Sequence, residues 1–166
     1  MIRPLKLRAC DGEDLQVLSG YLQDAIVPIG EMCFVPADRR FAMVVSRFRW
    51  ETCSGDAAAA PPRTEGDAGL EDAESPACYE RVHCGICFDG IEAARTRGVD
   101  LRDRGVILNL LTIGEEEGAV VMHFSGGACI RLDGRDWTCR IEDLGEPWPT
   151  SRRPCHLFEE PEAGAA

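Results

Sequence analysis

The chain has 166 residues, of which 45% are hydrophobic, and this length is sufficient for one domain to bury a core without disulfide bonds. Its formal net charge of -11 at pH 7 is unevenly distributed. Residues 51–77 hold seven acidic side chains against Arg63, and Glu159, Glu160 and Glu162 add three more, so the remaining residues are close to neutral. A near-neutral domain lacks the basic surface typical of nucleic-acid binding, and we expect no nucleic-acid partner.

The N-terminal residues contain no apolar signal region, and no apolar run approaches the roughly 20 residues that a membrane-spanning helix needs. We therefore expect a soluble, cytoplasmic protein with no membrane partner. In a reducing cytoplasm, its nine cysteines are predicted to be mainly free thiols rather than a disulfide framework.

The first elements predicted are a short strand and an amphipathic helix. Apolar residues alternate with Lys6 and Arg8 over residues 5–9, which indicates a strand with one buried face. Asp11 can cap a helix over residues 12–25, because apolar side chains then recur at helical spacing. These side chains are Leu15, Leu18, Leu22 and Ala25.

A long β-hairpin follows, around which a core can form. Its first strand is predicted at residues 32–35 and its second strand contains the apolar run of residues 41–45. Between them, residues 36–39 contain the Pro and Asp that favour a turn. The length of this apolar pattern makes the hairpin the centre of the predicted fold.

The second strand of this hairpin carries two of the arginines. Successive strand side chains point to opposite faces, so Val44, Phe48 and Trp50 share one face. Arg47 and Arg49 share the other face. We expect the apolar face to pack in the core and the face with the arginines to be charged and exposed.

Further strands are predicted after residue 78. In residues 79–88 the alternation places Val82, Cys84, Ile86 and Phe88 on one face, and Tyr79, Arg81, His83 and Cys87 on the other. Residues 91–97 and 106–113 also have strand character, and residues 114–118 are typical of a hairpin loop. These strands can extend the sheet and bury the apolar face of the hairpin, which alone would be only marginally stable in water.

The hairpin around residues 125–127 has two candidate registers. A two-residue Gly-Gly turn would place Met122 opposite Arg131. A three-residue loop would place Met122 opposite Ile130 and keep one face apolar, so we expect the second register. The segment that follows, residues 137–144, fits either a strand or a helix.

The predicted fold class is α+β. We expect a mainly antiparallel sheet of about seven or eight strands, curled into a half-barrel or split into a sandwich, with the N-terminal helix packed on one side. Residues 51–77 cannot bury enough apolar surface to offset their ordering entropy, so they are predicted to be a disordered acidic insertion in a single domain over residues 1–150. Residues 151–166 are predicted to be a flexible tail.

Five short motifs, taken in order, carry a resemblance to a known family. They are Leu22-Gln23-Asp24-Ala25, Arg47-Phe48-Arg49-Trp50, Arg97-Gly98-Val99-Asp100, Gly126-Gly127-Ala128 and Asp143-Leu144-Gly145-Glu146-Pro147-Trp148. Over residues 5–150 this order resembles a small family of uncharacterised bacterial proteins, mainly alphaproteobacterial, that is catalogued as a domain of unknown function. The resemblance implies a soluble bacterial protein and provides no catalytic residues.

The densest group of metal-ligand residue types consists of Cys78, His83, Cys84 and Cys87. Thiolates in a Cys-x-x-Cys pair can bind zinc when a tight turn holds them together. Residues three apart on a strand, however, point to opposite faces and cannot chelate one ion. A metal or thiol-redox site here is therefore the alternative hypothesis, with zinc as its ion, and otherwise no cofactor is expected.

Arginines two residues apart form the favoured candidate site. Arg47 and Arg49 lie on one predicted strand and Arg95 and Arg97 on another, so each pair presents two guanidinium groups on one face. If the two strands are neighbours, the four groups form a patch suited to phosphate or carboxylate, which arginine binds bidentately. The other interpretation is a solvated sheet face whose charges pair with nearby acids.

No spacing of residues indicates a catalytic site. His123 and Ser125 lie two apart, but neither a nucleophile motif nor a suitably placed acid accompanies them. We therefore hypothesise a non-enzymatic binding or adaptor protein that recognises a small anionic ligand or an acidic protein partner. The residues proposed for this role are Arg47, Arg49, Arg95 and Arg97.

Overall fold

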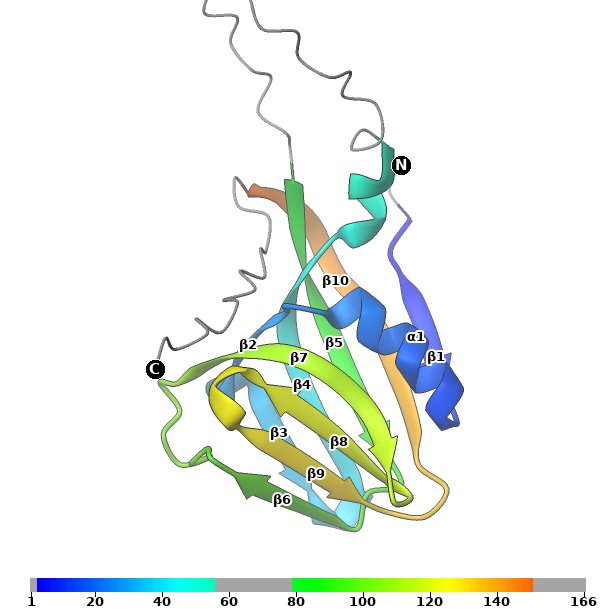
Figure 1. Cartoon of the computed structure of the whole chain (residues 1–166), viewed down its shortest axis with the longest axis vertical. Helices are drawn as coiled ribbons and strands as arrows, with labels where there is room; N and C mark the ends of the chain where they lie inside the picture. Colours follow the sequence, from blue (N-terminus) through cyan, green and yellow to red (C-terminus); the bar gives the residue numbers. More distant parts are fainter. Residues whose placement is uncertain (1–2, 56–78, 151–166) are drawn as a thin grey trace, which may run out of the picture.

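The computed structural model describes residues 3–55 and 79–150, and within these ranges ten strands form one antiparallel sheet that curls over a single α-helix (Figure 1). The strand order is β1-β10-β5-β4-β2-β7-β8-β9-β6, and β3 pairs with β4 off this path. The strands are β1 (Lys6–Ala9), β2 (Ile26–Pro28), β3 (Met32–Val35), β4 (Arg40–Phe48), β5 (Tyr79–Asp89), β6 (Ala93–Arg97), β7 (Ile107–Glu116), β8 (Ala119–Phe124), β9 (Cys129–Asp133) and β10 (Thr138–Thr150).

The predicted α+β class and the antiparallel sheet are confirmed, with more strands than expected. A short 3-10 turn, η1 (Ile29–Glu31), separates β2 from β3 and so adds a strand before the predicted hairpin. Residues 138–144 of the ambiguous segment at residues 137–144 belong to strand β10, whose backbone pairs with β1 on one side and β5 on the other. Two neighbouring strands therefore satisfy backbone groups that a helix would have satisfied internally.

The helix α1 (Gly12–Leu22) begins at the residue that the sequence predicts. The Asp11 side chain accepts a hydrogen bond of 2.9 Å from the Asp14 backbone N–H, which satisfies one of the unpaired donors of the first turn. The helix ends three residues earlier than expected. Asp24 adopts a left-handed φ of 61°, and its N–H donates to the Leu110 carbonyl at 2.8 Å, so pairing with β7 replaces the last helical turn.

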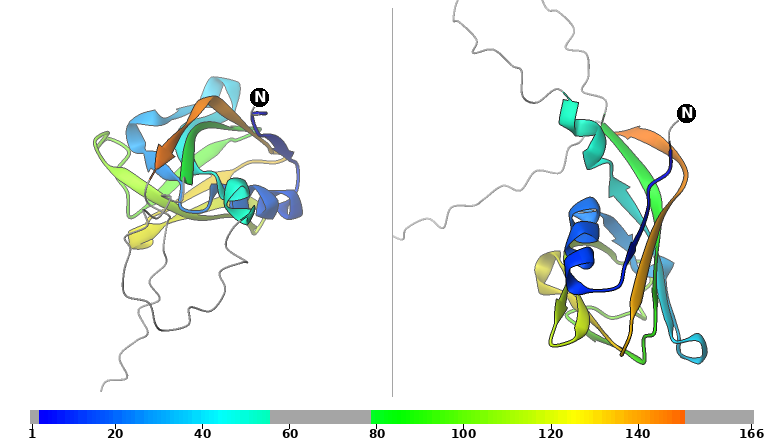
Figure 2. Two further views of the ribbon diagram at one scale, coloured as in Figure 1. Left: turned by 90° about the horizontal axis from the view of Figure 1, so that it is seen from above. Right: turned by 90° about the vertical axis from the view of Figure 1, so that its right-hand side faces the viewer.

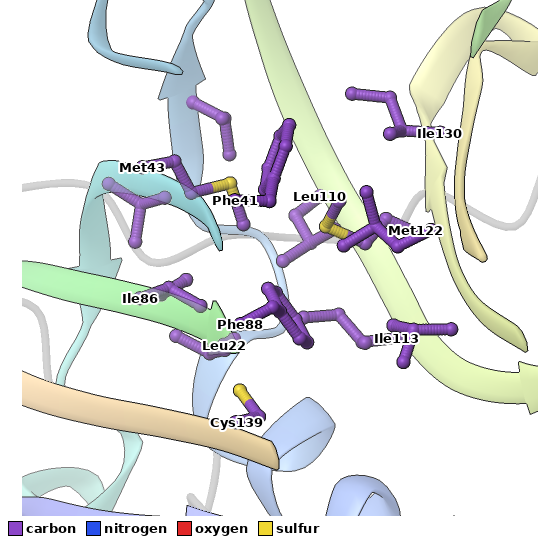
Figure 3. Close-up of a cluster of buried hydrophobic side chains, with 14 of the residues drawn as sticks. Leu22, Phe41, Met43, Ile86, Phe88, Leu110, Ile113, Met122, Ile130 and Cys139 are labelled. Carbon is purple, nitrogen blue, oxygen red and sulfur yellow. The ribbon is translucent and has the colours of Figure 1, made fainter. Parts of the chain in front are cut away.

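The curled sheet forms two layers with the hydrophobic core between them (Figure 2). Strands β1, β10, β5 and β4 make one layer, and β7, β8, β9 and β6 make the other. Helix α1 packs against β7, β1 and β4 and covers an open side of the core. Side chains from both layers and from the helix meet there (Figure 3), including Leu22, Phe41, Phe88, Leu110 and Met122.

The register of the β8–β9 hairpin is the one that the apolar pattern predicts. Met122 pairs with Ile130, and the Phe124 N–H donates to the Ala128 carbonyl at 2.9 Å. The three-residue loop uses Gly126 and Gly127 at φ values of 77° and 80°, a left-handed conformation that glycine adopts without a steric penalty. The turn between β7 and β8 is shorter than the predicted loop.

The predicted insertion and tail lie largely outside the described residues. Residues 50–55 form the 3-10 helix η3 (Trp50–Gly55), so the start of the predicted disordered insertion is ordered. Residues 56–78 and 151–166 are outside the described ranges. Within these ranges, no helix has the length and apolarity needed to cross a bilayer.

We predict that Gly134→Ala destabilises the protein, because a Cβ at this position would overlap the backbone carbonyl of Gly90. The expected loss is roughly 1–3 kcal/mol of unfolding free energy, measured by urea denaturation followed by circular dichroism. Gly114→Ala is the matched control, since a Cβ there meets no atom within 4 Å, and its change should stay within about 0.5 kcal/mol. Equal midpoints for the two variants would contradict this close approach.

Candidate functional site

Arg47 and Arg49 lie in the interior of the protein instead of on an exposed face. Arg47 is 0% exposed and Arg49 is 8% exposed to solvent. Arg47 lies on the same face of β4 as Phe41 and Val45, which are both core residues, so the predicted assignment of faces is wrong. The run from residue 41 to 45 is apolar on both faces, and its pattern could not indicate which face packs inward.

Two carboxylates surround the Arg47 guanidinium. Its Nε donates to Asp143 Oδ1 and its Nη2 to Asp143 Oδ2, both at 2.7 Å. Nη1 and Nη2 donate to Glu51 at 3.0 and 2.7 Å, and Nη1 also points to the Phe48 carbonyl at 3.5 Å. All five N–H groups therefore have an acceptor. Asp143 Oδ2 also accepts the Leu5 N–H at 3.1 Å, which connects the start of the chain to the group.

Arg49 and Glu80 extend this group into what we call the Arg47 cluster: Arg47, Arg49, Glu51, Glu80 and Asp143. Arg49 Nη1 contacts Glu80, and its Nε lies 3.7 Å from Glu51. The cluster contains two guanidinium groups against three carboxylates, so it has no surplus of positive charge to offer an anion. Its residues connect β4, β5, β10 and η3, and this is a structural role.

Both partners of the Arg47–Glu51 pair are ionised at neutral pH. Burial is the largest influence on Arg47 and acts to lower its pKa, but the hydrogen bonds that Arg47 donates to Asp143 and Glu51 outweigh it and raise the pKa. Burial likewise acts to raise the pKa of Glu51, but the hydrogen bond and charge of Arg47 bring that pKa below its usual value. The charges thus stabilise one another inside the fold.

Arg95 and Arg97 do not join this cluster. They lie on β6, which the strand order separates from β4 by β2, β7, β8 and β9. Both are exposed, and Arg95 pairs with Asp133 at 3.2 Å. The condition for a four-arginine patch, that β4 and β6 are neighbours, is not met. Whether either pair binds a ligand stays a prediction.

The predicted metal ligands are also dispersed. Cys84 is buried on the core face of β5, whereas Cys87 lies on the opposite face, as the strand alternation predicts. Burial raises the pKa of the Cys84 thiol to about 12. His83 is exposed and its ring lies 4.6 Å from that of Trp148, and Cys78 is outside the described residues. In the described part of the chain, no three His, Cys, Asp or Glu side chains are grouped to hold a metal ion.

A different feature, which we call the outer groove, lies on the face of the β1-β10-β5-β4 layer that points away from α1. It has a volume of about 620 Å³. Its floor consists of small or apolar residues: Ala42, Val44, Gly85 and Cys87. The outward face of an antiparallel sheet is ordinarily polar, so an apolar floor there is unusual. Leu144, which is 42% exposed, lines the groove as well.

The strand registers explain why this face is hollow. One row across the sheet runs Cys33, Ala42, Cys87, Arg140 and Arg8. The next row runs Val44, Gly85, Glu142 and Lys6. Short side chains on β4 and β5 therefore lie beside long side chains on β10 and β1, and the difference in length makes the groove.

Arg8 and Arg140 line the outer groove, and Arg40 and Asp89 lie beside it on β4 and β5; we call these four residues the basic end. Arg40 and Arg140 both contact Asp89, at 2.8 and 3.1 Å. A hydrogen bond from Arg40 is the main reason why the pKa of Asp89 is lowered, so this carboxylate is ionised. Two guanidinium groups thus share one carboxylate, and Arg8 has no ion pair among the residues described.

Known families provide an independent comparison. A family model described as a protein of unknown function (DUF2948) matches residues 5–156. The chain belongs to the DUF2948 family. This confirms the predicted resemblance to a family of unknown function, and the match spans both the Arg47 cluster and the outer groove. Comparisons with curated proteins and with solved structures give no significant match.

Sequence reasoning missed the outer groove in this DUF2948 domain, although one signal was present. Gly85 lies in the middle of an otherwise regular strand pattern, and an isolated strand glycine often marks a site that a ligand or another backbone approaches closely. The pairing of Gly85 with Val44 and Glu142 depends on strand order. No local pattern indicates that order.

We predict that Arg47→Met lowers the unfolding free energy by about 3–5 kcal/mol, because it leaves the Asp143 and Glu51 carboxylates without their cation. Urea denaturation followed by circular dichroism measures this loss. Arg95→Met removes an exposed guanidinium and is the control, with an expected change within about 0.5 kcal/mol. A wild-type midpoint for Arg47→Met would show that the cluster has no structural role.

We also predict that the contribution of Glu51 disappears in acid. Because folding lowers the pKa of Glu51 below its ordinary value, Glu51 stabilises the fold above that ordinary value, and the stabilisation is lost as the pH falls through the lower folded pKa. The difference in unfolding free energy between wild type and Glu51→Gln should therefore shrink from about pH 6 to about pH 3. Glu115→Gln, at an exposed position, should show no such trend. A difference that grows in acid would contradict the assignment.

Proposed function

We propose that this protein is a non-enzymatic binding protein of the bacterial cytoplasm, and that its outer groove recognises an acidic segment of a partner protein. The observation that carries the proposal is the combination of an apolar floor with a basic end on a sheet face that is ordinarily polar. An unpartnered apolar surface rimmed by charge is typical of an interaction site.

The size and shape of the outer groove fit a short extended segment. Its volume of about 620 Å³ lies within the roughly 300–1,000 Å³ of ordinary ligand sites. The floor side chains Val44 and Gly85 are followed, two residues along their strands, by Ala42 and Cys87 of the next row, about 7 Å away. An apolar side chain of the partner can pack on this floor while a neighbouring carboxylate reaches Arg8 or Arg140.

Charge complementarity favours an acidic partner over a basic one. Most of the net charge of -11 lies in residues 51–77 and at Glu159, Glu160 and Glu162, and the remaining residues are close to neutral. The basic end is locally positive, because Arg40 and Arg140 contact the single carboxylate of Asp89 and Arg8 lies in the same row as Arg140. A partner carboxylate would gain charge-assisted hydrogen bonds there.

Binding is favoured over catalysis by the residues that line the outer groove. Among the described residues that line it, there is no serine or threonine hydroxyl, and there is no histidine to act as a base for the Cys33 or Cys87 thiol. The alternative of a metal or thiol-redox site at Cys78, Cys84 and Cys87 has weaker support, because Cys84 and Cys87 point to opposite faces of β5.

The test uses 8-anilino-1-naphthalenesulfonate, a fluorescent probe that combines an apolar ring system with an anionic group. We expect the folded wild type to bind it, and the Arg8→Gln, Arg140→Gln double variant to bind it roughly tenfold more weakly, the equivalent of about 1.4 kcal/mol for two exposed contacts. Val44→Glu, which places a carboxylate on the floor, should abolish binding.

Arg95→Gln with Arg97→Gln is the matched control, because it removes two exposed guanidinium groups from β6 and should leave probe affinity unchanged. Short peptides that combine apolar residues with Glu should displace the probe more effectively than the same peptides with Gln in place of Glu. Equal affinity of wild type and the Arg8, Arg140 variant, with melting temperatures unchanged, would contradict the proposal.

A further inference from the structure

We propose that Cys87 is a site of covalent modification, at which the protein forms a mixed disulfide with a small anionic disulfide of the glutathione class. The site lies in the outer groove but does not require the proposed partner protein. It is a cluster of a nucleophile, neighbouring cations and a cavity of about 620 Å³ with space for the incoming molecule.

The surroundings of Cys87 place positive charge next to its sulfur. Arg140 Nη2 donates to Cys87 Sγ at 3.8 Å, and the thiol can donate to Asp89 Oδ2 at 3.9 Å. The Asp89 carboxylate is held at the same time by Arg40 and Arg140. A guanidinium group next to the sulfur is the kind of environment in which cysteines are reactive.

The basic end also selects the charge of the incoming molecule. Arg140 and Arg8 follow Cys87 in the same row across the sheet, at successive spacings of about 4.8 Å. A disulfide whose carboxylates lie a few bonds from its sulfur can place one carboxylate on Arg140 or Arg8 while its sulfur meets Cys87. A cationic disulfide of similar size would be repelled from the same position.

Four other thiols of the described residues, those of Cys84, Cys139, Cys10 and Cys33, lack this combination. Cys84 and Cys139 are buried, and burial raises the pKa of both thiols, so they are neither accessible nor readily ionised. Cys10 is exposed, but no guanidinium group donates a hydrogen bond to it among the residues described. Cys33 lines the same groove two strands from Cys87, about 10 Å away, which is too far for the two to form a disulfide with each other.

The reaction is a thiol–disulfide exchange. The Cys87 thiolate attacks one sulfur of the small disulfide, and a new S–S bond forms to the protein as the original S–S bond breaks. The departing half leaves with the electron pair as a thiolate, which takes up a proton. Oxidation of Cys87 is balanced by reduction of that half, so no further oxidant is needed. The adduct fills the groove and excludes any other occupant.

The experiment compares oxidised glutathione, which is anionic, with cystamine, which is a cationic disulfide. The reduced full-length protein is incubated with each reagent at neutral pH, and peptide mass spectrometry follows the adduct at each cysteine over time. We expect Cys87 to react roughly tenfold faster with oxidised glutathione than with cystamine. Cys10, in the same molecules, should show little preference.

Two variants make the test specific. Arg140→Gln should reduce the reagent preference of Cys87 to that of Cys10, and Arg97→Gln, which removes an exposed guanidinium on β6, should not. The proposal is overturned if Cys87 reacts no faster than Cys10 with oxidised glutathione, or if its preference survives Arg140→Gln. Binding of the fluorescent sulfonate by the reduced wild type involves no disulfide exchange, so failure of this inference can be distinguished from failure of the proposed function.

Discussion

The buried guanidinium of Arg47 is the interaction on which the arrangement of this protein most depends. A charge with no exposure to water is stable only when its partners are present. Here they are Asp143 of β10, which is distant in sequence, and Glu51 of η3, four residues further along the chain. Asp143 in turn accepts the N–H of Leu5 and so holds the chain just before β1. The outermost strands of one layer are therefore positioned by a central ion pair as well as by their ladder hydrogen bonds.

The Arg47–Asp143 pair spans β5, since Arg47 belongs to β4 and Asp143 to β10. On the opposite face of the same three strands lie the floor and the basic end of the outer groove. On the inner face, Arg47 has a structural role and all its N–H groups have acceptors. On the outer face, Arg40 and Arg140 share the single carboxylate of Asp89. The rigid inner face keeps the rows of the outer face in register, and a preorganised surface loses less entropy on binding.

Arginine chemistry alone did not distinguish these two uses. Arg47 and Arg140 each lie in a strand with alternating residues, and the local sequence around each is compatible with an exposed guanidinium. They differ in their partners. Arg47 donates to the carboxylates of Asp143 and Glu51, whereas Arg140 shares the Asp89 carboxylate with Arg40 and contacts the thiol of Cys87. Glu51 lies in a segment whose composition predicts disorder, so its pairing with Arg47 was not visible in the sequence.

Local patterns in the sequence determined the antiparallel strands, the cap at Asp11, the turn after β3 and the register of the β8–β9 hairpin. Each of these depends on residues close together in the chain, where side-chain period and turn geometry leave few alternatives. Only the tertiary structure decided the strand order, the inward direction of Arg47 and the row that joins Cys87 to Arg140 and Arg8. These depend on pairing between distant strands, because burial of a charge is favourable only when a distant partner neutralises it.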